Sequence, residues 1–345
     1  MLFSSIPFAF YFLPAVLVLY FAVPFRFKNA ILLAFSLFFY GWGEPVYLLL
    51  MMASIVAGWI FGLLIGKHRG TPKAKLLLTL SLVTSLGLLG WFKYADFAVE
   101  NLNALGLQLT LPGIALPIGI SFYTFQILSY TIDVYRGNVE SQKNIVDFGA
   151  YVSMFPQLIA GPIVRYADVA RQLKSRTHSV EKASLGVRRF VIGLAKKVLI
   201  ANQLGQLVEL YRSTTQPSVL FVWMYAAAFA LQIYFDFSGY SDMAIGLGHI
   251  FGFDLLENFN YPFISRSISE FWRRWHMSLG GWFRDYVYIP LGGNRVKPLR
   301  YVFNVLVVWA LTGLWHGAAW NFVLWGLLFA VLLTVEKFLV GKAMA

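Results

Sequence analysis

Two histidines occupy positions where an imidazole could move protons for a reaction inside a membrane. His316 lies within Leu314-Trp315-His316-Gly317, near the middle of residues 301–335, which contain no Asp, Glu, Lys or Arg. Ionisable side chains in such apolar surroundings are costly and usually have a function. Because imidazole takes up and releases a proton near neutral pH, we interpret His316 as a candidate general base. The alternative is a packing or interfacial histidine at a helix end.

His276 ends the densest basic and aromatic segment of the chain, residues 271–276 (Phe-Trp-Arg-Arg-Trp-His). Beside a membrane, such a segment can simply anchor a helix at the lipid headgroups. In the functional interpretation, Arg273 and Arg274 attract an anionic donor such as a phosphate-bearing cofactor, and His276 assists the reaction. The two interpretations are compatible.

Further polar residues are candidates for the lining of a cavity. Asp236, Ser238 and Asp242 lie in an otherwise apolar stretch. The two carboxylates are six residues apart and do not share one helical face, which argues against a paired acid–base dyad. Each is either satisfied by an Arg, a hydroxyl or a backbone donor, or lines the cavity. The remaining candidates for this lining, in shaped turns or beside His316, are Asn260, Trp315 and Asn321.

Composition predicts that these residues belong to an all-α polytopic membrane protein. Of the 345 residues, 59% are hydrophobic and 13% are charged, whereas soluble domains average about 25% charged residues. The net charge of +12 comes from basic residues between apolar runs, which the positive-inside rule explains better than binding to nucleic acid. The absence of cysteine excludes disulfides and thiolate catalysis. No HExxH motif or carboxylate cluster predicts a metal site.

The apolar runs predict the elements that must position the candidate residues. Residues 301–335 would measure about 52 Å as one helix, well beyond a membrane core of roughly 30 Å, so we expect a break near His316. Residues 145–164 carry Phe-Pro-Gln and Gly-Pro, which predict a broken or re-entrant element. We expect membrane segments at 6–23, 29–43, 45–66, 76–92, 112–135, 186–210 and 217–235, an interfacial helix at 95–111, and a continuation at 236–253 after a polar interruption.

Charge predicts the orientation of the chain. The basic loop at residues 67–75 is most simply cytoplasmic. Three spans precede it, which places the N-terminus outside the cytoplasm. Of two further basic stretches, residues 165–197 are expected on the cytoplasmic side and residues 266–300 on the cytoplasmic side or at the interface.

Taken together, several motifs resemble the membrane-bound O-acyltransferase family, and within it the branch of the alginate O-acetyltransferase membrane subunit. Jointly the motifs are specific, and they cover most of residues 121–325, with a further likeness at residues 1–24. The matching stretches are residues 155–162 (Phe-Pro-Gln-Leu-Ile-Ala-Gly-Pro), 236–242 (Asp-Phe-Ser-Gly-Tyr-Ser-Asp), 271–276, 282–286 continuing to Arg295, and 314–317 (Leu-Trp-His-Gly).

This resemblance implies a fold, an activity and roles for both histidines. His316 matches the catalytic histidine of the family, and His276 matches its second signature position. The implied fold is one domain over residues 1–345, a ring of tilted helices with re-entrant and interfacial helices around a central tunnel. Similar chains continue for several more membrane segments after the Trp-His-Gly motif, whereas this sequence ends at Ala345, so we expect a domain shortened at its C-terminus.

The implied activity is O-acyl transfer, most simply of acetyl, in a bacterial plasma (inner) membrane. The donor would be acetyl-CoA or another acyl thioester on the cytoplasmic side, with no metal. The acceptor would be a hydroxyl of an extracytoplasmic polysaccharide, reached directly or through a partner acetyltransferase, with membrane lipid around the protein. Two alternatives stay open: transfer of D-alanine to teichoic acid, and a proton-coupled transporter that uses the intramembrane Asp236, Asp242 and His316.

Overall fold

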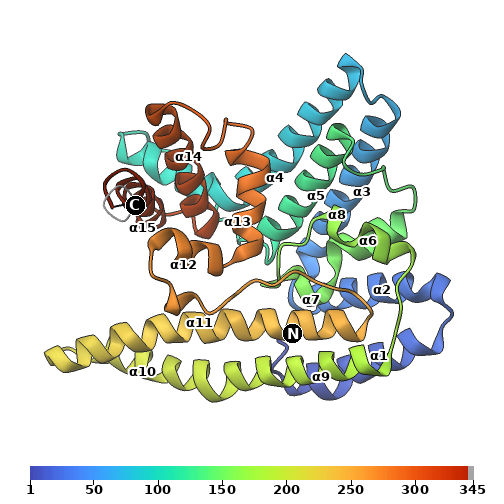
Figure 1. The fold of residues 1–345 in the computed structure, drawn as a ribbon, viewed down its shortest axis with the longest axis horizontal. Coiled ribbons are helices and arrows are strands. Elements are labelled where there is room, and N and C mark those ends of the chain that lie inside the picture. Colours follow the sequence, from blue (N-terminus) through green and yellow to red (C-terminus); the bar gives the residue numbers. More distant parts are fainter. Residues whose placement is uncertain (341–345) are drawn as a thin grey trace.

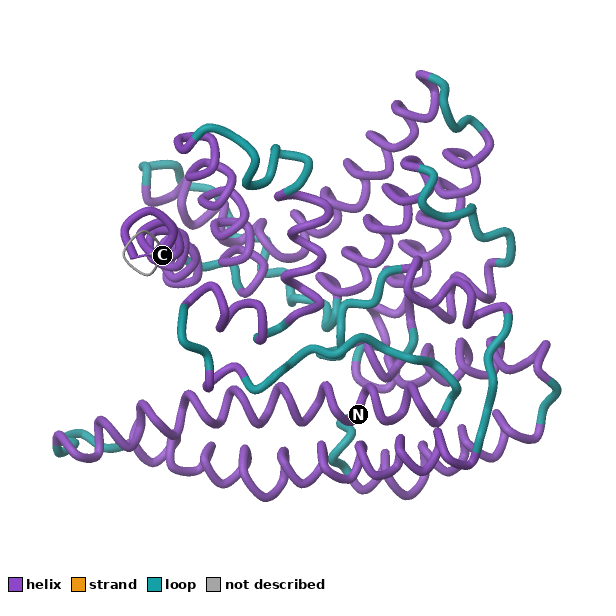
Figure 2. Tube along the Cα trace, in the orientation of Figure 1, coloured by secondary structure: helices purple, strands orange, loops and turns teal. Residues whose placement is uncertain are grey.

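The chain, seen in a computed structural model that describes residues 1–340, is built of helices (Figures 1 and 2). Within that range the one β-type pairing is an isolated bridge between Phe259 and Trp275. Five helical segments are long and apolar enough to cross a membrane: Pro45–Lys67 (α3), Pro72–Ala104 (α4), Val219–Ile250 (α11), Pro298–His316 (α14) and Trp320–Leu339, which contains α15 (Trp320–Val335). The prediction of an all-α polytopic membrane protein is confirmed.

Further helices complete the described part of the chain. They are η1 (Pro7–Phe12), α1 (Leu13–Ala22), α2 (Phe25–Gly43), α5 (Ile120–Arg136), α6 (Ile145–Ser153), α7 (Phe155–Leu158), α8 (Tyr166–Lys174), α9 (Val180–Ala195), η2 (Lys196–Ala201), α10 (Asn202–Ser213), η3 (Pro262–Ile264), α12 (Ile268–Arg274), α13 (Met277–Phe283), η4 (Arg284–Tyr288) and η5 (Glu336–Val340).

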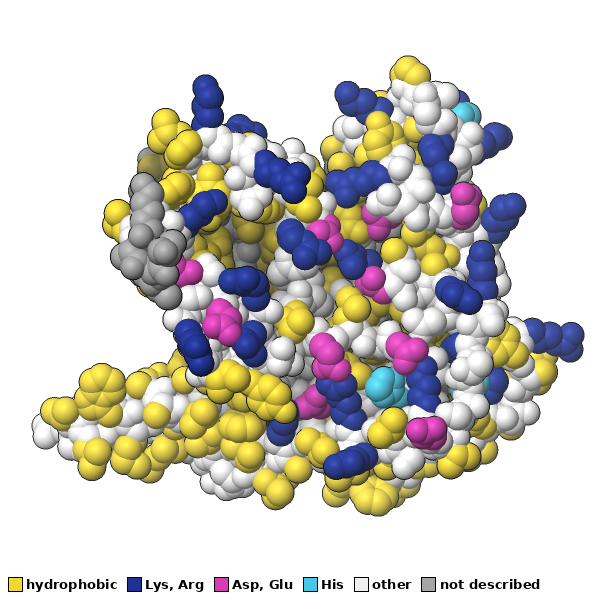
Figure 3. Space-filling model, viewed as in Figure 1, with side chains coloured by type: hydrophobic (Ala, Val, Ile, Leu, Met, Phe, Trp, Pro, Cys, Tyr) yellow, Lys and Arg dark blue, Asp and Glu magenta, His cyan; other side chains and the backbone are white. Residues whose placement is uncertain are grey.

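Three groups of helices lie around the middle of the molecule. In Figure 1, α9, α10 and α11 make an elongated hairpin along one edge, α3, α4 and α5 pack side by side, and α12 to α15 form the third group. α5 buries most of its 17 residues between its neighbours. Hydrophobic side chains cover the outer helices such as α10 and α11, whereas charged side chains gather around a hollow on the face in view (Figure 3). This distribution suits a protein with a lipid-facing perimeter.

Glycines bring α9 and α11 into close contact. A Cβ atom added to Gly186 would lie 2.5 Å from the carbonyl oxygen of Gly246, and one added to Gly193 would lie 2.5 Å from that of Gly239. Small residues of this kind let membrane helices approach closely and gain packing energy. The contact aligns the basic residues near the end of α9 with the carboxylates of α11.

Several predicted breaks can now be checked. Residues 301–335 do break beside His316, where α14 ends and Gly317 is extended, and residues 145–164 are broken between α6 and α7. The predicted interruption at Asp236 is wrong, because α11 is continuous from Val219 to Ile250. The interfacial helix at 95–111 is also wrong, because α4 runs on to Ala104 and the chain then becomes irregular.

We expect Gly246→Ala to weaken the α9–α11 contact. The new Cβ would lie 2.5 Å from the carbonyl oxygen of Gly186, and overpacking of this kind typically costs about 1–3 kcal/mol. The thermal midpoint of the detergent-solubilised protein should fall. Gly90→Ala, in α4, is the matched control, since a Cβ there meets nothing within 4 Å. An equal fall in both variants would contradict the assignment of this contact.

Candidate active site

A central cavity of about 660 Å³ lies between α12, α13 and α14 and is lined by both His276 and His316. Arg273 from α12 and Arg284 from η4 add two guanidinium groups to its wall, and Thr312 adds a hydroxyl one turn before His316. The cavity therefore combines two imidazoles with cationic groups inside a largely apolar group of helices.

His276 is held in a strained and buried position just before α13. Its backbone is left-handed, with φ of 45°, and such a conformation costs a non-glycine residue about 1–3 kcal/mol. The bridge between Phe259 and Trp275 imposes it, together with a hydrogen bond of 3.0 Å from the Met277 amide to the Asn258 carbonyl. Strain that persists in this way points to a functional constraint on the residue.

The imidazole of His276 is poorly satisfied by the protein. Its side chain is 3% exposed, and neither ring nitrogen has a hydrogen-bond partner within the described range. Burial, with a smaller contribution from His316, lowers the pKa of His276 well below its usual range. A neutral ring with both nitrogens unpaired is available to a bound molecule, because unpaired buried polar groups are costly.

His316 stands at the end of α14, where the helix stops and the chain turns toward α15. The side chain is exposed, and the space around it belongs to two cavities, the central cavity and a second one. The Trp315 ring lies against both histidines, with centroid distances of 5.5 Å to His276 and 5.0 Å to His316. Trp325 of α15 meets the other side of His316 at 5.0 Å.

The second cavity, which we call the Lys93 cavity, has a volume of about 250 Å³. Its wall combines Lys93 of α4, Ser121 at the start of α5, and Trp315 and His316 at the end of α14. Of the two histidines, His276 lines only the central cavity, whereas His316 lines both the central cavity and the Lys93 cavity. One imidazole can therefore face molecules that arrive in two separate spaces.

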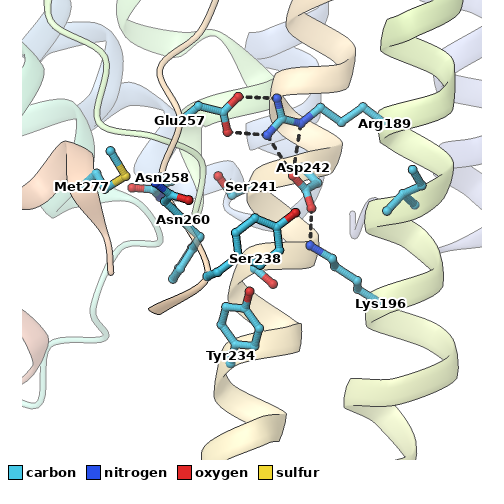
Figure 4. A pocket seen from close by; sticks show the side chains of 13 residues that line it. Arg189, Lys196, Tyr234, Ser238, Ser241, Asp242, Glu257, Asn258, Asn260 and Met277 are labelled. Atoms are coloured by element: carbon cyan, nitrogen blue, oxygen red, sulfur yellow. Dashed lines mark hydrogen bonds and ion pairs between the residues drawn. The ribbon is translucent and has the colours of Figure 1, made fainter. Parts of the chain in front are cut away.

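A third, polar cavity of about 570 Å³ lies between α9, α11 and the strand-like segment that leads to the bridge (Figure 4). Arg189 donates to Glu257 at 2.5 Å and to Asp242 at 3.0 Å, and Lys196 donates to Asp242 at 2.6 Å. The hydroxyls of Ser238 and Ser241 and the amide nitrogen of Asn258 are buried there without a partner in the described residues. Met277 is common to this cavity and the central one.

The structure distributes the residues predicted from sequence over these three cavities. His276, His316 and Arg273 line the central cavity, Trp315 lines the Lys93 cavity, and Ser238, Asp242 and Asn260 line the polar cavity.

Three other predicted residues line none of these cavities. Asp236 pairs with Lys197 at 2.6 Å, Arg274 pairs with Glu270 at 2.8 Å, and Asn321 is exposed near the start of α15. Both carboxylates of α11 are thus satisfied by cations, which was one of the two interpretations of the sequence.

Sequence reasoning missed Lys93 and Arg189. The signal for Lys93 was available, because it is a lone cation between apolar residues in Trp91-Phe92-Lys93-Tyr94, the same argument that singled out His316. Arg189 lies in a basic stretch where nothing in the sequence separates it from its neighbours. Among residues 1–340, no group of three or more His, Asp or Glu side chains is arranged to hold a metal ion.

Comparison with known proteins identifies similar chains. Residues 140–341 match the family described as MBOAT, membrane-bound O-acyltransferase family. The chain is 47% identical to the probable alginate O-acetylase AlgI of Azotobacter vinelandii, over 98% of this chain and 69% of that protein. The protein of the same name from Pseudomonas aeruginosa is also 47% identical, over 98% of this chain and 66% of its own length.

Two other kinds of relative are more distant. The peptidoglycan O-acetyltransferase of Helicobacter pylori is 37% identical over 98% of this chain and 70% of that protein. The teichoic acid D-alanyltransferase of Bacillus subtilis is 32% identical over 64% of this chain and 59% of that protein. The chain thus spans about two thirds of the length of the relatives that it matches along its whole length.

We expect Asp242→Ala to destabilise the protein far more than Asp236→Ala. Asp242 is the common partner of Arg189 and Lys196, and its side chain is 16% exposed. Its removal leaves Lys196 without a carboxylate partner among the described residues and Arg189 with Glu257 alone, and losing hydrogen bonds to a charged group costs about 1.5–3 kcal/mol. Asp236 has one partner and is 44% exposed, so its loss should cost less than about 1 kcal/mol. Thermal melting of both purified variants in one detergent measures the difference, and equal losses would refute the ranking.

Proposed function

The chain belongs to the membrane-bound O-acyltransferase family, and from that premise we propose that it moves an acetyl group from a cytoplasmic thioester to a hydroxyl of an extracytoplasmic polysaccharide. The acceptor is reached directly or through a partner protein. Relatives named for alginate and peptidoglycan O-acetylation, which match along 98% of this chain, support a polysaccharide as the final acceptor.

The observation that carries this proposal is the position of His316 between two cavities. A transfer between a donor and an acceptor that arrive from different sides needs one group that both can reach. His316 lines the central cavity and the Lys93 cavity at the point where α14 ends. We assign the donor to the central cavity, with its thioester carbonyl beside His316 where the Lys93 cavity begins, and the acceptor hydroxyl to the Lys93 cavity.

In the proposed reaction, His316 is the general base. It accepts the proton of the acceptor hydroxyl, and the oxygen then attacks the carbonyl carbon of the thioester. Collapse of the tetrahedral intermediate breaks the C–S bond, and the thiolate takes the proton back from His316. His276, neutral and with both ring nitrogens unpaired, assists by hydrogen bonding to the bound thioester. Trp315, in contact with both rings, keeps them in place.

The donor is acetyl-CoA or another acyl thioester, drawn by the cationic wall of the central cavity. Arg273 donates to the Ser269 carbonyl at 3.1 Å, and no carboxylate within residues 1–340 forms an ion pair with it. Its charge is therefore free for an anionic group such as a phosphate, which guanidinium binds with paired hydrogen bonds. Arg284, in contrast, pairs with Asp285 at 2.7 Å, a carboxylate that Arg165 also contacts at 2.6 Å.

We further propose a placement in the cell. The protein is a multi-pass membrane protein, and the bacterial sources of its relatives favour the inner membrane. The basic loop after α3 favours a cytoplasmic position for that end of the helix, with the N-terminus outside. We treat residues 1–345 as a single transmembrane domain.

D-alanyl transfer is the second candidate within the family. It is favoured less, because the teichoic acid relatives match 64% of this chain and are 32% identical at most among those compared. Incubating membranes with radiolabelled acetyl-CoA or with a D-alanyl carrier protein separates the two donors.

Membership of an acyltransferase family also favours an enzyme over the proton-coupled transporter.

We expect His316→Ala to abolish acetylation of the polysaccharide without loss of expression or membrane insertion, because the base is removed. His276→Ala should retain a reduced rate, since this residue assists without taking the proton. The measurement is acetyl content of the polymer from cells carrying each variant. His68→Ala, in the loop after α3 and away from the three cavities, is the control that should keep full acetylation. Normal acetylation by the His316 variant would falsify the proposed role.

We expect Arg273→Gln to raise the KM for acetyl-CoA about tenfold, with a smaller effect on kcat. In our proposal Arg273 binds the donor before the reaction, and a hydrogen bond to a charged group contributes about 1.5–3 kcal/mol. Steady-state kinetics in membrane vesicles measure both constants. Arg212→Gln, an exposed residue of α10, is the matched control. An unchanged KM in the Arg273 variant would mean that the donor binds elsewhere.

A further inference from the structure

Lys93 places an ammonium group inside the membrane without a carboxylate partner. The residue belongs to α4, one of the candidate spans, and lines the Lys93 cavity together with His316. Its Nζ donates to the Ser121 hydroxyl at 3.0 Å and to the carbonyl oxygen of Trp315. No Asp or Glu among residues 1–340 lies within ion-pairing distance.

This arrangement leaves the charge of Lys93 uncompensated. An ammonium group has three N–H donors, and Ser121 and Trp315 accept two of them. The third is left for whatever occupies the cavity that Lys93 shares with His316. A lone charge at membrane depth is costly, so a negative group that forms in this cavity would be strongly favoured.

Anchoring of the helix end does not by itself explain the charge. The hydroxyl of the next residue, Tyr94, donates to the Leu314 carbonyl at 2.8 Å. The adjacent carbonyl of Trp315 is the one that Lys93 binds. The neutral Tyr94 hydroxyl thus already satisfies one carbonyl at the end of α14, and a neutral hydrogen-bond donor at position 93 could satisfy the Trp315 carbonyl in the same way. The positive charge indicates a further role.

We propose that Lys93 is a catalytic residue that stabilises the oxyanion of the tetrahedral intermediate. The inference rests on the proposed acyl transfer. When the acceptor oxygen bonds to the carbonyl carbon, the C=O π pair moves onto the carbonyl oxygen, which becomes negative. The proton from the acceptor resides on His316 at that stage. When the C=O bond re-forms, the C–S bond breaks and the thiolate leaves with that proton.

The surrounding contacts orient the ammonium before any substrate arrives. Ser121 is 8% exposed and lies in the first turn of α5, two residues after Gly119, whose φ is 75°. A Cβ at Gly119 would lie 2.8 Å from the Leu158 carbonyl oxygen, so the turn is tightly seated against α7. Donors that are fixed in advance toward a developing charge reduce the barrier without reorganisation during the reaction.

The experiment compares charge with anchoring at the same helix end. Full-length protein in lipid vesicles is assayed with acetyl-CoA and an alginate oligosaccharide, for the wild type and for Lys93→Met, Lys93→Gln, Lys93→Arg and Tyr94→Phe. We expect both neutral Lys93 variants to lower kcat about 10²- to 10³-fold, the magnitude typical for loss of one oxyanion donor, with the KM for acetyl-CoA changed less than threefold. Lys93→Arg should recover part of kcat, and Tyr94→Phe should stay within about threefold of the wild type.

The outcomes separate this inference from the proposed function. If the wild type and His316→Ala transfer acetyl equally, the acyl-transfer proposal fails first. If the wild type is active and His316→Ala is not, yet Lys93→Gln keeps a normal kcat, the role of Lys93 alone is overturned. Equal losses in Lys93→Gln and Tyr94→Phe also overturn it, because anchoring would then account for the effect. Thermal melting identifies variants that fail to fold, and Lys93→Gln, which retains hydrogen-bond donors, then decides in place of Lys93→Met.

Discussion

The cost of an uncompensated charge in apolar surroundings is the constraint on which the rest of this structure depends. Several side-chain charges of the helices near the middle of the molecule have a partner of opposite sign. Asp242 is held by Arg189 and Lys196, and Asp236 by Lys197. These pairs let α11 run as one helix through a stretch that contains two carboxylates. Lys93 has no such partner among the described residues, and its position in one cavity with His316 makes this informative.

The same constraint applies to backbone groups where helices end inside the protein. The last carbonyls of α14 have no helical partners, and two side chains of α4 supply donors to Leu314 and Trp315. The backbone before α13 is satisfied by pairing with residues 258–260, and this pairing forces the left-handed conformation of His276. Both histidines thus lie where a helix begins or ends, and neighbouring segments supply hydrogen bonds to the backbone there. The imidazole rings are therefore not needed for this purpose and can face the cavities.

Membership of the acyltransferase family and the arrangement of cavities support each other. Acyl transfer across a membrane needs a base that two substrates can reach from separate spaces, and His316 has that position. The donor side, as we propose it, carries the cationic wall of the central cavity, and the acceptor side carries the ammonium of Lys93. The polar cavity shares Met277 with the central cavity and therefore extends the space near His276 toward α9. It is lined by buried hydroxyls that have no partner among the described residues.

The sequence by itself determined the class of fold and the family, because long apolar runs without charges are typical of membrane helices. It also singled out both histidines as candidates, because an ionisable group in or beside such a run stands out. It also located the break beside His316, since residues 301–335 are too long for one span. Only the tertiary structure decided which charges are neutralised. Asp236 and Asp242 look alike in sequence, but the packing of α9 and η2 against α11 pairs both with cations. Lys93 and His316 line one cavity, and the hydrogen bond from Lys93 to the Trp315 carbonyl joins residues 222 positions apart, which no local pattern encodes.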